Sequence, residues 1–153
     1  MVKKSERIDG LLEQQSENHS HAEAMDRCYA GFFKCFNEAH YFEAHDVLEH
    51  LWLRCRDENR PYYQGLIQIA GAFVHLKKHH LRPGHPKDAG RLRPAVRLFH
   101  LGVKNLQPYC PRHMRFDVGS LVRQCEKLAS EIVASQFQTN PWHPERPPSL
   151  RLE

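Results

Sequence analysis

A histidine and two carboxylates stand at helical spacing in the stretch Glu43-Ala-His-Asp-Val-Leu-Glu49, which otherwise has the pattern of an amphipathic helix. Imidazole and carboxylate groups are common general acids and bases and common metal ligands. At about 100° per residue, His45 and Glu49 lie on one edge of this helix, where their side chains can converge. Glu43 falls about 160° from His45, so we expect it to complement the N–H groups of the helix N-terminus. The candidate catalytic pair is therefore His45 and Glu49, with either residue as general base.

A second polar stripe lies on the next predicted helix, whose other positions are mostly apolar. The stripe covers an arc of about 80° and is formed by Gln64, Gln68, Gly71, His75 and His79. In an antiparallel hairpin of the two helices, Glu49 falls near the level of Gln68 and His45 near Gly71 or Ala72. Because Gly71 has no side chain, it would let the helices approach closely. One polar cluster between the second and third helices would then comprise His45, Glu49, Gln64, Gln68 and His75.

Three interpretations of this cluster stay open. The stripe is the solvent face of a mostly buried helix, or the cluster is a hydrogen-bonded network that stabilises the fold, or it is an active or metal site. A metal would use His45 with Glu49, or His75 with His79, whose spacing suits zinc or another transition metal. Two ligands are too few for a tight site, and neither His-Glu-x-x-His nor paired Glu-x-x-His occurs. The sequence therefore assigns no cofactor.

The composition indicates one soluble domain with tails. The chain has 153 residues, 41% of them hydrophobic, which is enough for a core that removes roughly two-thirds of the unfolded surface from water. No apolar run approaches the ~18 residues of a membrane span. The five cysteines include no Cys-x-x-Cys pair, which argues against a zinc ribbon, a redox dithiol and a secreted disulfide scaffold. We expect a cytoplasmic protein, with an organelle stroma as the alternative, and homo-oligomer formation is left open.

Positive charge is concentrated between Lys77 and Arg97. The formal net charge is +4, and this stretch contains seven basic residues and one acidic residue, Asp88. The seven are Lys77, Lys78, Arg82, Lys87, Arg91, Arg93 and Arg97. Such a stretch is either a solvated face or a contact for phosphate or an acidic partner.

Recurrence of apolar residues at three and four positions predicts helices over about residues 22–37, 41–55, 61–78, 88–105 and 118–137. Pro61 suits the first position of the third helix, and Pro94 either kinks the fourth helix or marks its first turn. We expect an all-α, single-domain bundle of about five helices over residues 21–138, with an antiparallel helical hairpin at its centre. Residues 1–20 would be a polar, disordered lead-in. Residues 139–153 would be an extended Pro-rich tail on or near the bundle, anchored by Trp142.

The run Tyr41-Phe-Glu-Ala-His45, followed by Glu49, Trp52 and Gly65-Leu-Ile-Gln68, resembles the small helical family known as domain of unknown function 309. The resemblance covers about residues 30–110, and the matching residues are Tyr41, Phe42, Glu43, His45, Glu49, Trp52, Gly65, Gln68 and His75. It implies an all-helical fold and no particular activity. The family usually has glycine at the position of Ala39 and glutamate at that of Asp46, and alanine at the first disfavours a left-handed cap. Together with the helical pattern, the resemblance makes Glu43, Trp52, Gly65 and Gly71 candidate structural residues.

Three functions from different classes are consistent with these patterns. The first is a structural or binding module in which the polar cluster is a satisfied network. The second is a metal-assisted hydrolase that uses His45 and Glu49. The third is binding of nucleic acid or an acidic partner through residues 77–97, which is the least favoured because no recognition-helix motif is present.

Overall fold

The computed structural model describes residues 19–88 and 90–153, and in this part of the chain five helices form a bundle. They are α2 (His19–Asn37), α3 (Tyr41–Arg54), α4 (Arg60–Leu81), α5 (Leu92–Leu106) and α6 (Val118–Ala134). The expected all-α fold is confirmed. The expected lead-in over residues 1–20 falls almost wholly outside the described residues. Among the helices described, none has the length and apolar character needed to cross a membrane.

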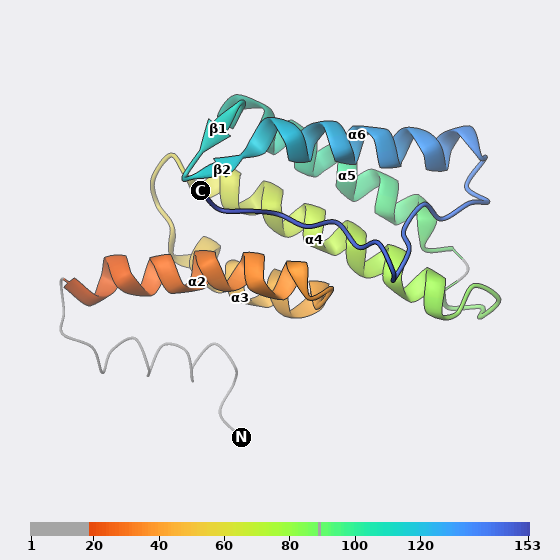
Figure 1. Ribbon diagram of the computed structural model, residues 1–153, viewed down its shortest axis with the longest axis horizontal. Helices are drawn as coiled ribbons and strands as arrows, with labels where there is room; N and C mark the ends of the chain where they lie inside the picture. The colour runs from red at the N-terminus through yellow and green to blue at the C-terminus, as the bar shows by residue number, and fades with distance from the viewer. Residues whose placement is uncertain (1–18, 89) are drawn as a thin grey trace, which may run out of the picture.

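Each helix packs mainly against its neighbours in sequence, and α4 lies centrally between α3 and α5 (Figure 1). Helices α3 and α4 are antiparallel. At one end of this pair, Arg60 Nη1 donates to the carbonyl of Trp52 at 3.0 Å. At the other end, Lys77 Nζ donates to the carbonyl of Ala39 at 2.9 Å. The hairpin predicted from the short connection is therefore confirmed, and both of its ends are tied by a basic side chain.

Helix α2 ends at Asn37, as the sequence predicts, in a Schellman motif. The N–H of His40 donates to Cys35 O at 2.8 Å, and the N–H of Ala39 donates to Phe36 O at 2.9 Å. Ala39 has φ 60°, in the left-handed region, although alanine has a Cβ that disfavours it. The expectation that alanine would prevent this cap is wrong. Helix α6 ends in the same way, with Gln136 at φ 57°.

The fourth expected helix begins later than predicted. Helix α5 starts at Leu92 rather than near Asp88, and turns occupy the residues between Pro86 and Leu92 that the structure describes. Pro94 is the third residue of α5, where its missing N–H has no helical acceptor to lose. Of the two roles considered for Pro94, the structure therefore selects the first turn and not a kink.

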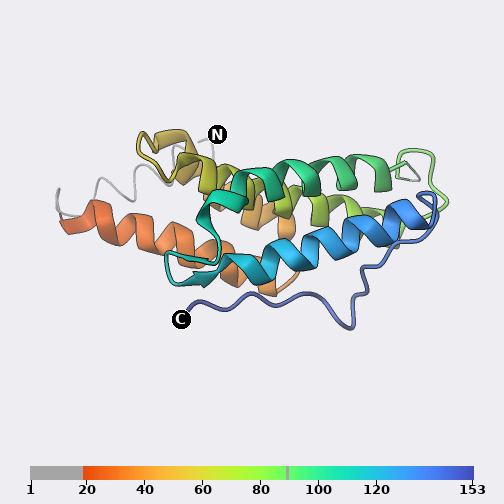
Figure 2. The ribbon, with the colours of Figure 1, turned by 90° about the horizontal axis from the view of Figure 1, so that it is seen from above.

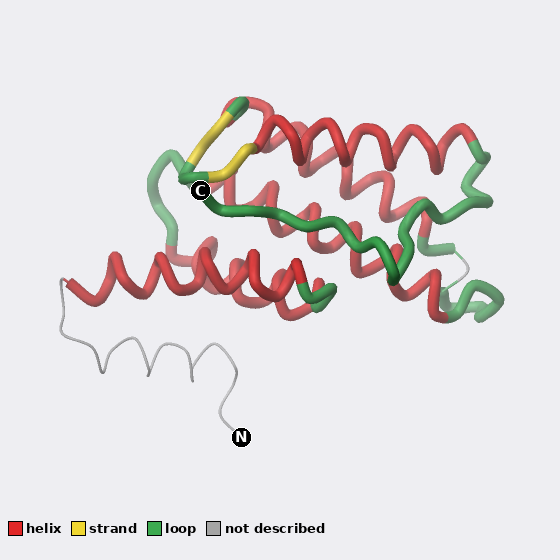
Figure 3. The backbone as a smooth tube through the Cα atoms, in the orientation of Figure 1, coloured by secondary structure: helices red, strands yellow, loops and turns green. Residues whose placement is uncertain are grey.

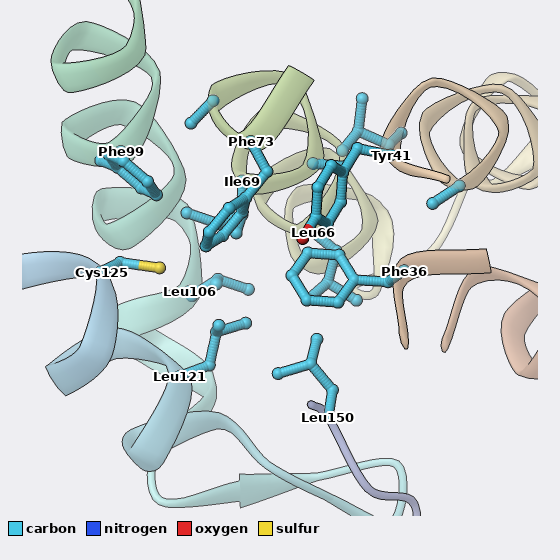
Figure 4. Packing of buried hydrophobic residues seen from close by; sticks show 14 of the residues in the cluster. Phe36, Tyr41, Leu66, Ile69, Phe73, Phe99, Leu106, Leu121, Cys125 and Leu150 are labelled. Carbon is cyan, nitrogen blue, oxygen red and sulfur yellow. The ribbon is translucent and has the colours of Figure 1, made fainter. Parts of the chain in front are cut away.

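The core is built largely from aromatic rings on α2, α3, α4 and α5 (Figure 4). Phe73 of α4 is at its centre. Its ring centroid lies 5.2 Å from that of Phe36, 5.2 Å from that of Tyr41 and 5.3 Å from that of Phe99. The pairs with Phe36 and Phe99 are edge-to-face and the pair with Tyr41 is stacked, and both arrangements stabilise a core beyond the burial of their area. Helix α4 thus contributes side chains to both halves of the bundle.

Helices α4 and α5 approach closely at two glycines. A Cβ on Gly102 would lie 2.5 Å from Ile69 Cδ1 and 3.0 Å from the carbonyl oxygen of Gly65. A Cβ on Gly65 would lie 2.8 Å from Leu106 Cγ. Both distances are shorter than carbon atoms tolerate. The sequence analysis expected glycine to allow a close approach between α3 and α4. The structure shows a close approach at Gly65 and Gly102, between α4 and α5.

A short hairpin that the sequence analysis did not predict precedes α6. Strands β1 (Arg112–His113) and β2 (Phe116–Asp117) pair antiparallel after a 3₁₀ turn, η1 (Gln107–Tyr109). Asp117 then caps α6, because its Oδ1 accepts from the N–H of Ser120 at 2.9 Å. Each strand has two residues, too few to show a period of two in the sequence.

The segment after α6 contains no helix and runs back along the bundle to the hairpin (Figures 2 and 3). Asn140 begins this return by donating Nδ2 to Leu76 O of α4 at 2.8 Å. At the far end Leu152 forms an antiparallel bridge with Phe116 of β2. The tail over residues 139–153 therefore lies on the bundle over most of its length.

Candidate functional site

His45 and Glu49 lie together on an outer edge of α3. His45 Nδ1 is 3.5 Å from Glu49 Oε2 and 3.4 Å from Asp46 Oδ1. The side chains of His45 and Glu49 are 32% and 42% exposed, and the ring of Phe42, itself exposed, stacks on His45 with centroids 6.4 Å apart. The convergence expected from the spacing is present. A general base needs a sheltered place for its substrate, and none of the three pockets described is lined by either residue.

The polar stripe of α4 faces α5 and not α3. Gln68 Oε1 accepts from Asn105 Nδ2 at 2.8 Å, and His75 Nδ1 lies 3.1 Å from Arg91 Nη1. A Cβ on Gly71 would likewise meet Leu98 of α5, at 3.2 Å. The structure therefore gives Gln68 and His75 partners other than His45 and Glu49, with which the sequence analysis had grouped them. Helix α4 has a neighbour on each side, and the sequence does not show which of them a polar stripe meets.

His75 and His79, the second candidate pair of metal ligands, have separate polar neighbours in the structure. Arginine only donates, so the contact with Arg91 requires His75 Nδ1 to accept and His75 to be neutral. Burial lowers the pKa of His75, and the nearby charges of Arg91 and Lys78 lower it further. His79 Nδ1 lies instead 3.3 Å from Asn140 Nδ2 of the tail. Within residues 19–88 and 90–153, no group of three or more His, Cys, Asp or Glu side chains is arranged to hold a metal ion.

The remaining candidate structural residues have separate positions. Glu43 lies exposed in the first turn of α3, where its charge complements the helix dipole. Trp52 is half-buried and packs under Arg60, whose guanidinium carbon is 4.5 Å from the ring centroid. The same arginine donates to the carbonyls of Trp52 and Cys55 at the end of α3. This contact fixes the turn between α3 and α4.

The basic stretch of residues 77–97 divides into parts with different surroundings. Lys77 is bound to the carbonyl of Ala39, and Arg93 lies over the ring of Phe137, 4.1 Å from its centroid. Four others surround a pocket of about 280 Å³ between the end of α4 and the start of α5. The charged and titratable residues lining this pocket, here called the basic pocket, are Lys78, Arg82, His85, Lys87, Asp88 and Arg91. Sequence analysis identified the charge of this stretch but not its concave shape.

Asp88 is the single acid in the lining of the basic pocket, and it is already paired. Its Oδ1 accepts from Arg91 Nε at 2.6 Å, and this hydrogen bond holds the pKa of the Asp88 carboxyl below its usual value. His85 Nδ1 is 3.9 Å from Asp88 Oδ2 but accepts from the N–H of Lys87 at 3.1 Å. That nitrogen carries no proton in this arrangement. The pocket thus has an excess of positive charge.

A buried tyrosine cluster at the other end of the bundle was missed by the sequence analysis. The hydroxyls of Tyr29 and Tyr62 are 2.6 Å apart. Tyr29 donates to Met114 O at 3.0 Å, so Tyr62 must donate to Tyr29. His113 packs its ring against Tyr62 and Tyr109, with centroids 4.7 and 4.8 Å away. The signal available was that the chain's five tyrosines include an adjacent pair, at the start of an apolar helix.

Burial raises the pKa of Tyr29 and of Tyr62 well above the ordinary tyrosine value. For Tyr29 the hydrogen bond from Tyr62 opposes this rise, whereas for Tyr62 the neighbouring Tyr29 adds to it. Both hydroxyls are therefore neutral near pH 7 and act as hydrogen-bonding groups. The cluster joins α2, α4 and the β-hairpin, and its chemistry is structural.

These features define a class: an all-helical bundle protein with a basic pocket and a tail packed along its side. Residues 29–85 match the model of the family described as domain of unknown function (DUF309). The match runs from within α2 to just after α4 and supports the family that the motif around His45 indicated. The match ends before α5, short of the end near residue 110 expected from the resemblance. The comparisons with curated proteins and with solved structures gave no match.

Proposed function

We propose that this protein is a binding module for phosphate-bearing ligands and that the basic pocket holds the phosphate group. The observation that carries the proposal is the convergence of four cationic side chains from α4, the following loop and the start of α5. Their one acidic neighbour is neutralised by Arg91. A phosphate group carries about −1.5 to −2 charges near pH 7, which complements this excess.

The surroundings of Arg91 favour the interpretation of the basic pocket as a ligand site over its interpretation as a solvated surface. Its Nε is bound to Asp88 and its Nη1 to His75, so the guanidinium is held before a ligand arrives. A side chain that is already ordered loses little conformational entropy on binding. Arginine also presents a planar fork of donors that matches phosphate oxygens.

The alternatives from the sequence have weaker support. The network between α3 and α4 is absent as a single cluster among the described side chains, because the α4 stripe binds α5. The hydrolase alternative depends on His45 and Glu49, which are partly exposed at the edge of α3 and line none of the three pockets described. The phosphate-binding proposal is related to the third alternative, binding of nucleic acid or an acidic partner through residues 77–97. The proposal is narrower, because it places the contact in the basic pocket alone.

A cytoplasmic location is part of the proposal. It is supported by all five cysteines being free thiols in the structure, two of them buried. Free thiols persist in reducing compartments. Fractionation of cells that express the tagged protein would test this, and recovery in a secreted or periplasmic fraction would contradict it.

Binding would be measured with two probes, a small phosphate monoester (glycerol 3-phosphate) and a fluorescent single-stranded RNA of 12 nucleotides. The matched variants are Arg82→Gln, in the pocket, and Arg97→Gln, in the same basic stretch but outside the pocket lining. We expect Arg82→Gln to weaken binding about threefold to tenfold, as for loss of one charge-assisted hydrogen bond. Arg97→Gln should change it less than about twofold, because a distant exposed charge is screened.

The two probes separate the sources of the phosphate. Saturable binding of glycerol 3-phosphate identifies a small metabolite site. RNA binding alone, with an affinity that falls steeply as salt rises, identifies a nucleic-acid backbone contact. Failure of both probes to bind at low salt would refute the proposal, as would equal losses from Arg82→Gln and Arg97→Gln.

A further inference from the structure

The tail is fixed to the bundle at two points that enclose a proline-rich segment. At the first, Trp142 is buried and its Nε1 donates to the hydroxyl of Tyr41 at 2.9 Å. At the second, Leu150 is buried and its backbone is held by Asn37. Asn37 Nδ2 donates to Leu150 O, and Leu150 N donates to Asn37 Oδ1, each at 2.7 Å. The segment between these anchors is 143–149.

This segment does not lie flat against α6. It forms a turn in which Arg146 N donates to His143 O at 3.1 Å. The prolines on either side, including Pro141 and Pro148, have fixed φ angles and restrict the backbone. The bend of the tail is visible in Figures 1 and 2. Between the turn and α6 is a pocket of about 340 Å³, at the lower end of the range for small-molecule sites.

The lining of this tail pocket has an apolar interior and a charged rim. Phe73 and Trp142, both buried aromatic residues, line it together with Leu128 and the rings of Pro141 and Pro148. At its rim are two exposed cations, Lys127 from α6 and Arg146 from the turn, opposed by one carboxylate, Glu131. Phe73 and Trp142 are 1% and 6% exposed, so the apolar surface open to a ligand is mainly that of Leu128 and the two prolines. This surface favours an apolar ligand, and the net charge of the rim favours a single negative charge.

We propose that the tail pocket binds a small apolar carboxylate such as an aryl carboxylate, with its hydrocarbon part against Leu128, Pro141 and Pro148 and its carboxylate on Arg146. None of the residues involved lines the basic pocket, so this second site is independent of the proposed phosphate site. The ligand would complete the contact between the tail and α6 and hold the turn of residues 143–146 in place. Arginine suits this role because its fork binds a carboxylate in a bidentate manner.

The test uses the two tryptophans of the chain, Trp52 and Trp142, as internal reporters. The whole protein is labelled with 5-fluorotryptophan and titrated with 1-naphthoate, followed by ¹⁹F NMR. We expect the Trp142 resonance to shift and saturate with a dissociation constant of about a millimolar or below, as ligand efficiency allows for this size. The Trp52 resonance should not move, because Trp52 does not line the pocket.

Two matched comparisons test the charge. Arg146→Gln should weaken 1-naphthoate about threefold to tenfold, whereas Arg151→Gln, an exposed tail arginine outside this pocket, should leave it within about twofold. The neutral 1-naphthylmethanol should bind more weakly than 1-naphthoate. The proposal is overturned by the absence of a saturable Trp142 shift, by an equal shift of Trp52, or by equal affinity of wild type and Arg146→Gln.

Discussion

The left-handed alanine at the end of α2 leads to a prediction with an unusual sign. Glycine normally destabilises a helix, yet we expect Ala39→Gly to stabilise this protein. Ala39 has φ 60° and is held there by the two hydrogen bonds of the Schellman motif. Its carbonyl also accepts from Lys77, so the chain cannot relax to another conformation without losing these contacts.

The magnitude follows from two opposing contributions. A left-handed conformation costs an L-residue with a Cβ roughly 1–2 kcal/mol. Glycine avoids this cost, but its greater freedom in the unfolded chain removes about 0.4–1 kcal/mol of stability. The midpoints of these ranges leave a net gain of about 0.8 kcal/mol, which corresponds to a rise in melting temperature of roughly 2–3 °C for a chain of this length.

The reverse substitution, Gly31→Ala within α2, is the matched control for Ala39→Gly. Gly31 lies inside α2 with no positive φ, and an added Cβ would lie 3.4 Å from Val47 Cγ1, an ordinary contact. Adding alanine there should therefore also stabilise, by about 0.5–1 kcal/mol. Both variants would be measured by urea denaturation with circular dichroism. A loss of stability in Ala39→Gly would refute the strain argument, because it would show that the helix propensity of the residue outweighs its backbone conformation.

Three further perturbations have defined outcomes. Tyr41→Phe removes the acceptor of the buried Trp142 N–H and should cost about 1–3 kcal/mol in urea denaturation; an unchanged midpoint would contradict this. Gly102→Ala should destabilise by about 1–3 kcal/mol through overpacking, and the loss should shrink in an Ile69→Val background, which removes the atom 2.5 Å away. Because the pKa of His75 is lowered from 6.5, the unfolded chain binds its proton first, so stability should fall as the pH drops below about 6.5. His75→Gln should flatten that decline, and an unaltered pH profile would count against the assignment.

The helices could be predicted because their apolar residues recur over several turns, and Pro61 and Asn37 mark ends by local chemistry. The end of α2 shows the limit of such rules. Alanine at position 39 disfavours a left-handed cap locally, but the hydrogen bonds of the motif and Lys77 outweigh that preference. The β-hairpin could not be predicted, because each of its strands has only two residues and shows no alternation in the sequence.

The candidate site was predictable in part. Helical geometry placed His45 and Glu49 together, because residues four apart share an edge. It also grouped Gln68 and His75 correctly on one face of α4. It could not decide whether that face meets α3 or α5, since this depends on the packing of three helices. The tail pocket could not be predicted for the same reason, because it is lined by α4, α6 and the tail, which only the fold brings together. The basic pocket is lined by the single stretch of residues 78–91, whose charge is visible in the sequence but whose concave shape is not.

The clamp between Asn37 and Leu150 has a consequence for synthesis of the chain. The two residues are 113 positions apart, and the second lies near the end of the sequence. On a ribosome, α2, α3 and α4 can pair as they emerge, but the side of the bundle that the tail covers stays open until residues 140–150 have been released. During this interval the hydroxyl of Tyr41 lacks its indole partner. The contacts of Tyr41 and Asn37 with the tail therefore form only after residues 140–150 have been translated, later than the contacts among α2, α3 and α4.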